Sequence, residues 1–354
     1  MSADSKPTCQ GHLLIRSFLL ITDAWTPQTN GVVTTWQTVI KHLENNGVDV
    51  TVVHAGLFKT WPLPTYPEIK IARNPWLMKS IVREAKPDAV HVATEGPLGV
   101  YARRLLMKCG IPYTTSLHTK FPEYVNERVR MPLSVGYAFM RWFHRPAVTT
   151  LCTTQSHKAE LEGWGLRDLF VWGRGVDIDR FHTQALRDRE RPRALYVGRV
   201  AVEKNIETFL SLDVGVDKVV VGDGPLKASL ESKYPEVQWL GYKYGEELVT
   251  EYAQADVFVF PSLTDTFGLV MLEANGCGTP VAAFPVTGPI DVVIEGENGA
   301  LDNDLALAIE RALQVPRQQC RQHAESNTWE VVANRLTENL VAIDWSNVLS
   351  HRLT

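Results

Sequence analysis

The sequence predicts an α/β protein with two domains, each built around a mostly parallel sheet. Apolar strand segments alternate with amphipathic helical segments through the first half, and the alternation begins again near residue 193. The chain has 354 residues, which is too long for one compact α/β unit and suits two domains of about 150–180 residues. A polar, charged segment at 177–193 separates the halves. We therefore expect a first domain at 1–185, a second at 186–326, and C-terminal helices at 327–354.

The first expected strand covers residues 13–22. Arg16 and Asp23 interrupt its apolar run, so a signal peptide is not expected here. Segment 58–76 contains four prolines and is expected to be an irregular connection. An amphipathic helix is expected at 31–47, where four apolar residues share one stripe: Val33, Trp36, Ile40 and Leu43. The other strands expected in this half are at 48–56, 88–94, 111–118 and 148–154.

The second half repeats the pattern and then becomes helical after Asp304. Two Rossmann-like halves in one chain imply a cleft between them, with a ligand at the carboxyl ends of the strands. The strands expected here are at 193–200, 217–225, 237–243 and 256–262. The helices expected here are at 204–212, 226–234, 245–255, 305–314 and 328–345.

Composition excludes several classes of protein. Apolar residues make up 45% and charged residues 21%, which is ordinary for a globular protein. No apolar run approaches the ~20 residues of a transmembrane helix. The five cysteines are widely spaced without a CxxC pair, which predicts a reduced, cytoplasmic protein without structural zinc.

The charge is uneven along the chain. Residues 1–190 hold 23 Lys and Arg against 17 Asp and Glu, whereas residues 191–354 hold 13 against 23. The basic half suggests an anionic partner, and the scattered charges argue against nucleic acid. An anionic membrane surface or an anionic acceptor fits this pattern, and uneven solvated faces are the alternative.

The stretch from Asp265 to Asp291 is the most informative segment of the chain, because Glu273 is the only charged residue between its ends. A carboxylate in so apolar a run needs a partner. The pattern predicts a strand, a tight loop and a helix that begins near Leu269, which places Glu273 one turn inside the helix. Open α/β sheets hold phosphates at such helix starts. A nucleotide-sugar site is therefore expected here, although Asp265 could merely cap the helix.

Three more residues follow strand ends or open a helix. Gly31 lies at a helix entrance, where a backbone without Cβ lets a diphosphate approach, or it belongs to a simple turn. Arg199 and Lys204 follow a strand and could neutralise a diphosphate leaving group, unless they are ordinary surface charges. The turn at 222–225 is not a GxGxxG fingerprint, and no GxxxxGK[ST] motif occurs.

Two features of the first half could face a cleft or a membrane. His118 and Glu95 each follow a strand and could face a cleft, although a lone histidine is more often structural. Segment 131–146 interleaves aromatic and basic residues, which suits a membrane interface or an ordinary buried helix with basic edges.

Taken together, these motifs resemble the family-4 retaining glycosyltransferases of the GT-B fold. The resemblance runs from about Leu19 to Trp345 and rests on TDAWTPQTNGVVTT, GRGVDIDRF, YVGRVAVEKN, VVGDGP and FPSLTDTFGLVMLEANGCGTPV. It implies two Rossmann-like domains that face a central cleft, with the C-terminal helices crossing back to the first domain. It also implies a nucleotide-sugar donor and no metal or other cofactor.

The resemblance assigns roles to individual residues. It implies donor-diphosphate contacts for Gly31, Arg199, Lys204 and the backbone of Gly268, Leu269 and Val270, ribose contacts for Glu273, and sugar or acceptor contacts for Asp265 and His118. The family pattern is Glu-x7-Glu, so Asp265 departs from it by one methylene, about 1.5 Å. This departure bears on the identity of the donor sugar.

The resulting hypothesis is a retaining enzyme that moves a hexose or hexuronic acid from a UDP-sugar to a hydroxyl acceptor. Diacylglycerol is the preferred acceptor, and a cytoplasmic protein, peripheral on the inner face of the plasma membrane, is the expected location. The alternatives are a soluble saccharide or small-alcohol acceptor, a nucleotide-sugar epimerase, and a non-catalytic nucleotide-sugar binder.

Overall fold

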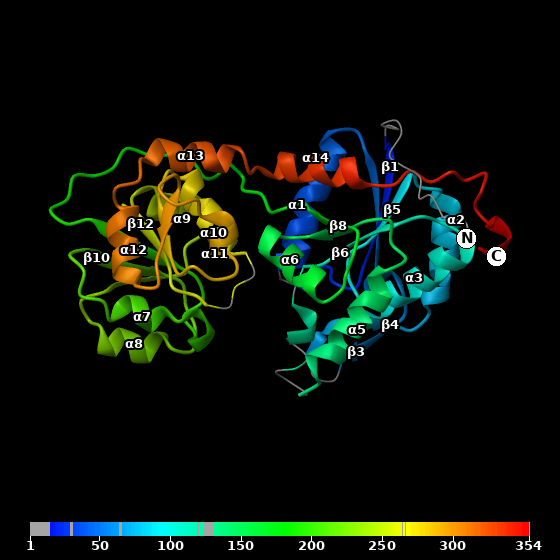
Figure 1. Ribbon diagram of the computed structural model, residues 1–354, viewed down its shortest axis with the longest axis horizontal. Helices are drawn as coiled ribbons and strands as arrows, with labels where there is room; N and C mark the ends of the chain where they lie inside the picture. Colours follow the sequence, from blue (N-terminus) through cyan, green and yellow to red (C-terminus); the bar gives the residue numbers. More distant parts are fainter. Residues whose placement is uncertain are drawn as a thin grey trace. The chain divides into compact units, whose positions relative to one another are not determined.

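The structure is a computed structural model, and it describes residues 15–28, 31–63, 66–118, 120–123, 126, 130–263, 265 and 267–353. The chain divides into two compact units (Figure 1). Unit 1 comprises the described residues up to Leu151 together with Trp164–Phe170 and 333–353, and unit 2 comprises Cys152–Gly163 and Val171–Val332. Each unit is built on a six-stranded sheet with parallel pairing, which confirms the expected α/β class.

The sheet of unit 1 has the strand order β2-β1-β5-β6-β7-β8. Its strands are β1 (Ser17–Thr22), β2 (Asp49–His54), β5 (Ala89–Val92), β6 (Thr114–Ser116), β7 (Thr150–Cys152) and β8 (Leu169–Val171). The helical elements of this unit are α1 (Gly31–Asn45), η1 (Ala55–Leu57), η2 (Pro75–Leu77), α2 (Met78–Ala85), α3 (Pro97–Cys109), α5 (Leu133–His144) and η4 (Ser350–Arg352).

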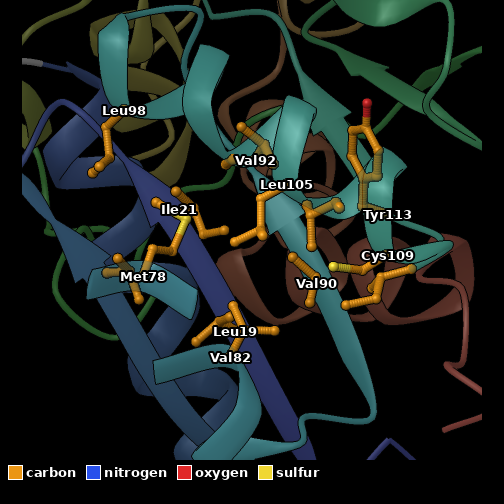
Figure 2. Close-up of a cluster of buried hydrophobic side chains, with 14 of the residues drawn as sticks. Leu19, Ile21, Met78, Val82, Val90, Val92, Leu98, Leu105, Cys109 and Tyr113 are labelled. Carbon is orange, nitrogen blue, oxygen red and sulfur yellow. The ribbon is translucent and has the colours of Figure 1, made fainter. Parts of the chain in front are cut away.

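A hydrophobic core joins the unit 1 sheet to helices α2 and α3. Figure 2 shows Leu19 and Ile21 of β1 beside Val90 and Val92 of β5, all four fully or almost fully buried. The helices supply the facing side chains, which are Met78, Val82, Leu98, Leu105 and Cys109. Alternate residues of β1 and β5 thus face this core, as the period of a strand requires.

The irregular connection expected at 58–76 is wrong in part, because this segment contains a hairpin. Strands β3 (Thr60–Leu63) and β4 (Tyr66–Ala72) pair antiparallel as a separate two-stranded sheet. Pro62 pairs with Lys70. Proline is tolerated there because each strand of a two-stranded ribbon has one edge that needs no partner.

The helix expected at 328–345 is shorter than expected. Helix α14 (Trp329–Asn339) ends six residues early, and the following residues, which include a turn before η4, are bonded to the rest of unit 1. The amide N–H of Ile343 donates to the carbonyl of Asp88 at 2.8 Å, and the Trp345 indole donates to the carbonyl of Pro87 at 2.9 Å. These tertiary bonds replace the helical ones.

Segment 131–146, the candidate membrane helix, forms α5. Its inner face is buried through Tyr137, Met140 and Phe143, and Arg103 of α3 donates to the carbonyls of Trp142 and Phe143. The helix is therefore packed into unit 1 and presents only a narrow outer face. Among the residues that the structure describes, no helix is both long and apolar enough to cross a membrane.

The sheet of unit 2 has the order β11-β10-β9-β12-β13-β14. Its strands are β9 (Arg193–Val197), β10 (Asp217–Val221), β11 (Gln238–Gly241), β12 (Val257–Phe260), β13 (Val281–Ala283) and β14 (Gly299–Leu301). Its helical elements are α6 (Gln155–Gly163), η3 (Val202–Lys204), α7 (Ile206–Leu210), α8 (Lys227–Lys233), α9 (Gly245–Ala253), α10 (Leu269–Gly276), α11 (Pro289–Val292), α12 (Leu305–Ala312), α13 (Arg317–Glu325) and the start of α14.

Both faces of this sheet are covered by helices. Leu195 and Phe258 belong to one buried cluster with α9 and α10, whereas Ala194 and Val257 belong to a second cluster with α7 and α12. Strands that are buried on both faces read as continuous apolar runs. This is why β12 could be located from the sequence alone.

Candidate functional site

The topological switch point of unit 2 lies between β9 and β12. From β9 the chain continues through β10 and β11 on one side of the sheet, and β12 lies on the other side of β9. Open α/β sheets bind ligands at the carboxyl ends of the strands beside such a point. The predicted donor-site residues of this half follow these two strands, with Arg199 and Lys204 after β9 and Asp265 to Glu273 after β12.

Lys204 and Asp265 are in direct contact at this point. The Lys204 Nζ lies 2.6 Å from Oδ1 and 2.8 Å from Oδ2 of Asp265. Both side chains are partly exposed, at 29% and 25%. An ammonium group has three N–H donors, so a lysine held by a carboxylate can still donate to a phosphate oxygen. The sequence separated these residues by 61 positions, and nothing in it indicated that they pair.

The loops on either side hold this pair in place. The side-chain amide of Asn205 donates to the carbonyl of Pro261 at 3.0 Å, which ties the turn after β9 to the end of β12. On the other side, a Cβ at Gly288 would lie 2.6 Å from the Asp265 carbonyl oxygen. Asp265 therefore lies close to the loop that contains Gly288, next to the tie between the turn after β9 and the end of β12.

Helix α10 begins at Leu269 directly after this pair. Its N-cap is Gly268, whose φ of 82° lies in the left-handed region that favours glycine. The backbone N–H groups at the start of an α-helix have no partner within the helix and attract anions. Gly268, Leu269 and Val270 therefore present a favourable backbone for a diphosphate.

Replacing Gly268 with alanine should destabilise the protein by about 1–3 kcal/mol, because alanine would be strained at this φ and its Cβ would be crowded. A Cβ there would lie 2.8 Å from Cε of Met271 and 2.9 Å from Cζ of Phe260. Denaturant unfolding measures the effect. Gly31→Ala is the matched control, because a Cβ at Gly31 meets no described atom within 4 Å and should leave stability nearly unchanged. Equal stabilities would contradict the strain at Gly268.

Glu273 lies one turn inside α10 and has a buried partner. The Tyr252 hydroxyl of α9 donates to its Oε2 at 2.9 Å. Burial raises the pKa of Glu273, and the Tyr252 hydrogen bond and the charge of Arg180 oppose this rise. A carboxylate with one oxygen held from the protein side can accept from a ligand with the other.

Arg199 has a different environment from that of Lys204. Its guanidinium lies 3.5 Å from the Glu203 carboxylate, and its side chain is 65% exposed. Its backbone carbonyl accepts a hydrogen bond from the Tyr196 hydroxyl at 2.8 Å. Burial and the neighbouring carboxylates of Asp265 and Glu203 raise the pKa of Tyr196, so it remains a neutral donor. The backbone at Arg199 is therefore fixed, whereas its side chain makes an exposed ion pair.

Two glycine-containing loops lie against each other next to Arg199. A Cβ at Gly222 would lie 1.9 Å from the carbonyl oxygen of Gly198, and one at Gly224 would lie 2.3 Å from that of Val200. The turn at 222–225 thus supports the loop that presents Arg199. This close approach explains its glycines without a ligand.

The other two predicted site residues lie in unit 1. Gly31 is the first residue of α1. His118 is buried and its Nε2 accepts a hydrogen bond from the Trp36 indole at 3.0 Å. The neutral imidazole then has its proton on Nδ1. The Ser116 hydroxyl also lies 2.9 Å from Nε2, so His118 is part of a structured polar network.

A pocket lies near the carboxyl ends of β1 and β2 in unit 1. Its lining includes Trp25, Gln28, His54 and Lys70. Asp23 also lines it and accepts hydrogen bonds from the backbone N–H groups of Leu98 and Gly99 and from the Thr94 hydroxyl. Burial raises the pKa of Asp23, and these three bonds lower it. A polar pocket with an indole beside it can hold hydroxyl groups of a ligand.

Comparison with known proteins identifies the family. Residues 29–180 match the family model described as Glycosyltransferase Family 4, and residues 191–315 match the one described as Glycosyl transferases group 1. A GDP-mannose-dependent alpha-mannosyltransferase of Corynebacterium glutamicum is 30% identical over 311 residues, which cover 80% of this chain and 75% of the relative. The chain is a family-4 glycosyltransferase.

Other relatives match the same chain, and a solved structure shows the same fold. The sulfoquinovosyl transferase SQD2 of Arabidopsis thaliana is 32% identical over 75% of this glycosyltransferase and 58% of the relative. The alpha-monoglucosyldiacylglycerol synthase of Streptococcus pneumoniae is 24% identical over 83% and 77%. The structure of sucrose-phosphate synthase from Thermosynechococcus elongatus aligns with a TM-score of 0.73 at 21% identity, covering 91% and 98% of the two chains. The predicted GT-B fold is thereby confirmed.

Two residues of this glycosyltransferase were not singled out from the sequence. Tyr252 lies in an expected helix 21 residues before Glu273, and no local pattern links the two. Asp23 appeared only as an interruption of an apolar run, yet it joins the end of β1 to the start of α3. Its place directly after a buried strand was the available signal.

Proposed function

We propose that this glycosyltransferase moves a hexose or hexuronic acid from a nucleotide sugar to a hydroxyl group of a lipid acceptor, with retention at the anomeric carbon. One observation supports this most strongly. The Lys204–Asp265 pair lies at the switch point of unit 2, directly before the start of α10, and Glu273 lies one turn further. Cation, helix start and partly buried carboxylate together match the parts of a nucleoside diphosphate sugar.

Each part of the donor has a proposed contact. The N–H groups at the start of α10 and the Lys204 ammonium bind the diphosphate, and Arg199 adds a second cation. The Glu273 carboxylate accepts hydrogen bonds from the ribose hydroxyls, while Tyr252 holds its other oxygen. Asp265 positions Lys204 and, by the resemblance to the family, faces the transferred sugar. The roles of Gly31 at the diphosphate and His118 at the acceptor also rest on that resemblance.

The proposed reaction is a front-face substitution. The bond between the anomeric carbon and the diphosphate oxygen breaks, and a bond from the same carbon to the acceptor oxygen forms on the same face. The acceptor proton passes to the departing phosphate oxygen. Negative charge develops on the diphosphate, so Lys204 and the start of α10 stabilise the transition state more than the ground state.

The identity of the donor and acceptor is a further part of the proposal. The relative from Corynebacterium glutamicum is named for GDP-mannose, which disagrees with the UDP-sugar expected from the sequence. GDP-mannose is therefore tested beside the UDP-hexoses. The relative named as a monoglucosyldiacylglycerol synthase supports a diacylglycerol-type acceptor.

Product detection by mass spectrometry tests the proposal. The purified enzyme is incubated with GDP-mannose or a panel of UDP-sugars and with vesicles that contain diacylglycerol. A new glycosyl-diacylglycerol, with the α-anomer from an α-linked donor, is the expected product. If product forms only with soluble saccharides, the acceptor is a saccharide and not a lipid. Conversion of the donor without an acceptor would indicate an epimerase. A product with inverted anomeric configuration would reject retention.

We expect the activity to be independent of added metal ions, because Lys204, Arg199 and the helix start supply the positive charge at the diphosphate. Dialysis against EDTA should change turnover less than about twofold, and added Mg²⁺ should not raise it above that range. The initial rate of product formation is the measurement. A loss of more than about tenfold with EDTA, restored by Mg²⁺, would require a metal at the diphosphate.

A further inference from the structure

Unit 1 has an exposed apolar surface on η1, β3 and η2. Four large apolar side chains form it: Leu57 is 52% exposed, Trp61 62%, Trp76 58% and Leu77 44%. Trp61 and Trp76 have the highest exposed fractions of the described tryptophans. Contiguous exposed apolar side chains mark interaction sites. We call these four residues the tryptophan surface.

The residues of the tryptophan surface come from two chain segments that are joined by hydrogen bonds. The backbone N–H of Lys59 donates to Oδ1 of Asn74 at 2.8 Å, and the N–H of Arg73 donates to the Lys59 carbonyl at 2.7 Å. These bonds join the segment that contains Leu57 and Trp61 to the segment that contains Trp76 and Leu77. The Arg73 guanidinium also lies over the Trp61 ring, 4.9 Å from its centroid.

The chain segment that carries this surface has a net positive charge. From Asp49 to Glu84 it contains five basic residues and three acidic residues, which are Asp49, Glu68 and Glu84. The basic residues are Lys59, Lys70, Arg73, Lys79 and Arg83. Cations interleaved with tryptophans favour an anionic lipid surface, because indole rings enter the head-group layer while the cations meet lipid phosphates. A protein interface of ordinary composition would be depleted in lysine.

We propose that the tryptophan surface, with its basic residues, docks this protein on a bilayer that contains anionic lipids. The outward face of α5 is the rival surface, but it offers less apolar area. Its exposed large side chains are Val135 at 52% and Trp142 at 40%, and the Arg103 guanidinium lies 4.0 Å from the centroid of the Trp142 ring. The tryptophan surface thus offers more exposed apolar side chains than α5, for which the sequence left a membrane interface and an ordinary buried helix open.

The unit 1 pocket adjoins the tryptophan surface. Ala55 and Gly56 line the pocket and directly precede Leu57, and Lys70 of β4 lines it from the hairpin. Docking at this surface would therefore bring lipid head groups to a polar pocket in the same unit. This consequence rests on the proposed lipid acceptor, whereas the docking itself does not.

Sedimentation with vesicles tests the docking without donor or acceptor. We compare vesicles of phosphatidylcholine alone with vesicles that also contain about one third anionic phosphatidylglycerol. Neither contains diacylglycerol. Trp61→Ser/Trp76→Ser should lower partitioning to anionic vesicles by at least about tenfold. Lys59→Gln/Arg73→Gln should lower this partitioning by about 25-fold, because each cation near the surface contributes about fivefold. Partitioning to neutral vesicles should change little.

Two control variants complete the experiment. Tyr242→Ser/Tyr244→Ser removes two exposed aromatic side chains from unit 2, at 61% and 71%, and should leave partitioning unchanged. Val135→Ser/Arg145→Gln tests α5 in the same way and should also have little effect. All altered side chains are exposed, so far-ultraviolet circular dichroism should show wild-type melting.

Three results would overturn the docking proposal. The first is wild-type protein that does not bind anionic vesicles, and the second is a loss of binding in the α5 variant but not in the tryptophan variant. The third is self-association in the ultracentrifuge that Trp61→Ser/Trp76→Ser abolishes, because the surface would then join two copies. Turnover with a water-soluble acceptor, measured on the same variants, separates failed docking from a failed transferase assignment.

Discussion

Lys204→Ala should lower turnover by more than about 100-fold while the protein stays folded. Removal of one preorganised donor to developing charge has effects of about 100- to 1,000-fold, because the transition state loses stabilisation that water does not replace. The variant also leaves the Asp265 carboxylate without the ammonium 2.6 Å away, so its negative charge would repel the departing diphosphate. Single-turnover rates with saturating donor measure the effect on the chemical step.

The control for this variant is another lysine in a close ion pair. Lys233→Ala removes the 2.5 Å contact with Glu207, on α8 and α7 of the same unit, but both side chains are about half exposed. We expect wild-type turnover and stability from it. Lys204→Ala should destabilise the protein by about 1 kcal/mol or less, since its pair is partly solvated. Turnover of Lys204→Ala close to wild type would reject Lys204 as the cation at the diphosphate.

Glu273→Gln should lower the affinity for the donor but raise the stability of the fold. The donor Kd should rise by about 10- to 100-fold, because hydrogen bonds from ribose hydroxyls to a charged acceptor become neutral ones. Stability at neutral pH should rise by about 1 kcal/mol, as is common when a strained functional group is replaced. Calorimetric titration with the nucleoside diphosphate and thermal unfolding are the two measurements.

The raised pKa of Glu273 determines how the stability difference between Glu273→Gln and the wild type changes with pH. Burial raises the pKa of Glu273 in the folded protein above that of the unfolded chain, so ionisation of Glu273 destabilises the fold. The folded state is most favoured below the unfolded pKa, and this advantage is lost as pH rises through the folded pKa. The extra stability of Glu273→Gln should therefore be present above the folded pKa and vanish below the unfolded one.

A second variant separates the two effects. Tyr252→Phe removes the hydroxyl 2.9 Å from Glu273 but leaves the carboxylate in place. It should raise the pKa of Glu273 further, so donor binding should begin to weaken at a higher pH than in the wild type. Donor affinity that is unchanged in both variants would exclude Glu273 from the nucleotide site.

The sequence by itself determined the alternation of strands and helices, the two sheets and the loop and helix that carry the proposed donor site. Strand and helix periodicities arise from local backbone geometry, and buried strands such as β12 appear as apolar runs. Glu273 could also be singled out from the sequence, because a single carboxylate in an apolar segment requires a partner. The β3–β4 hairpin could not be predicted, because its prolines indicate an irregular segment. Proline is compatible with a strand only at an edge that has no partner, and the sequence does not show which edge that is.

Only the tertiary structure decided which side chains meet. Lys204 and Asp265 follow different strands, and their contact depends on β9 and β12 lying side by side in the sheet order. Glu273 and Tyr252 meet because α9 and α10 pack on one face of that sheet. The exposure of Trp61 and Trp76 likewise follows from how the hairpin and η2 join, since a tryptophan in the sequence is equally suited to a core or to a surface. Contacts between distant segments have no local pattern, so they become visible only when the sheet order is known.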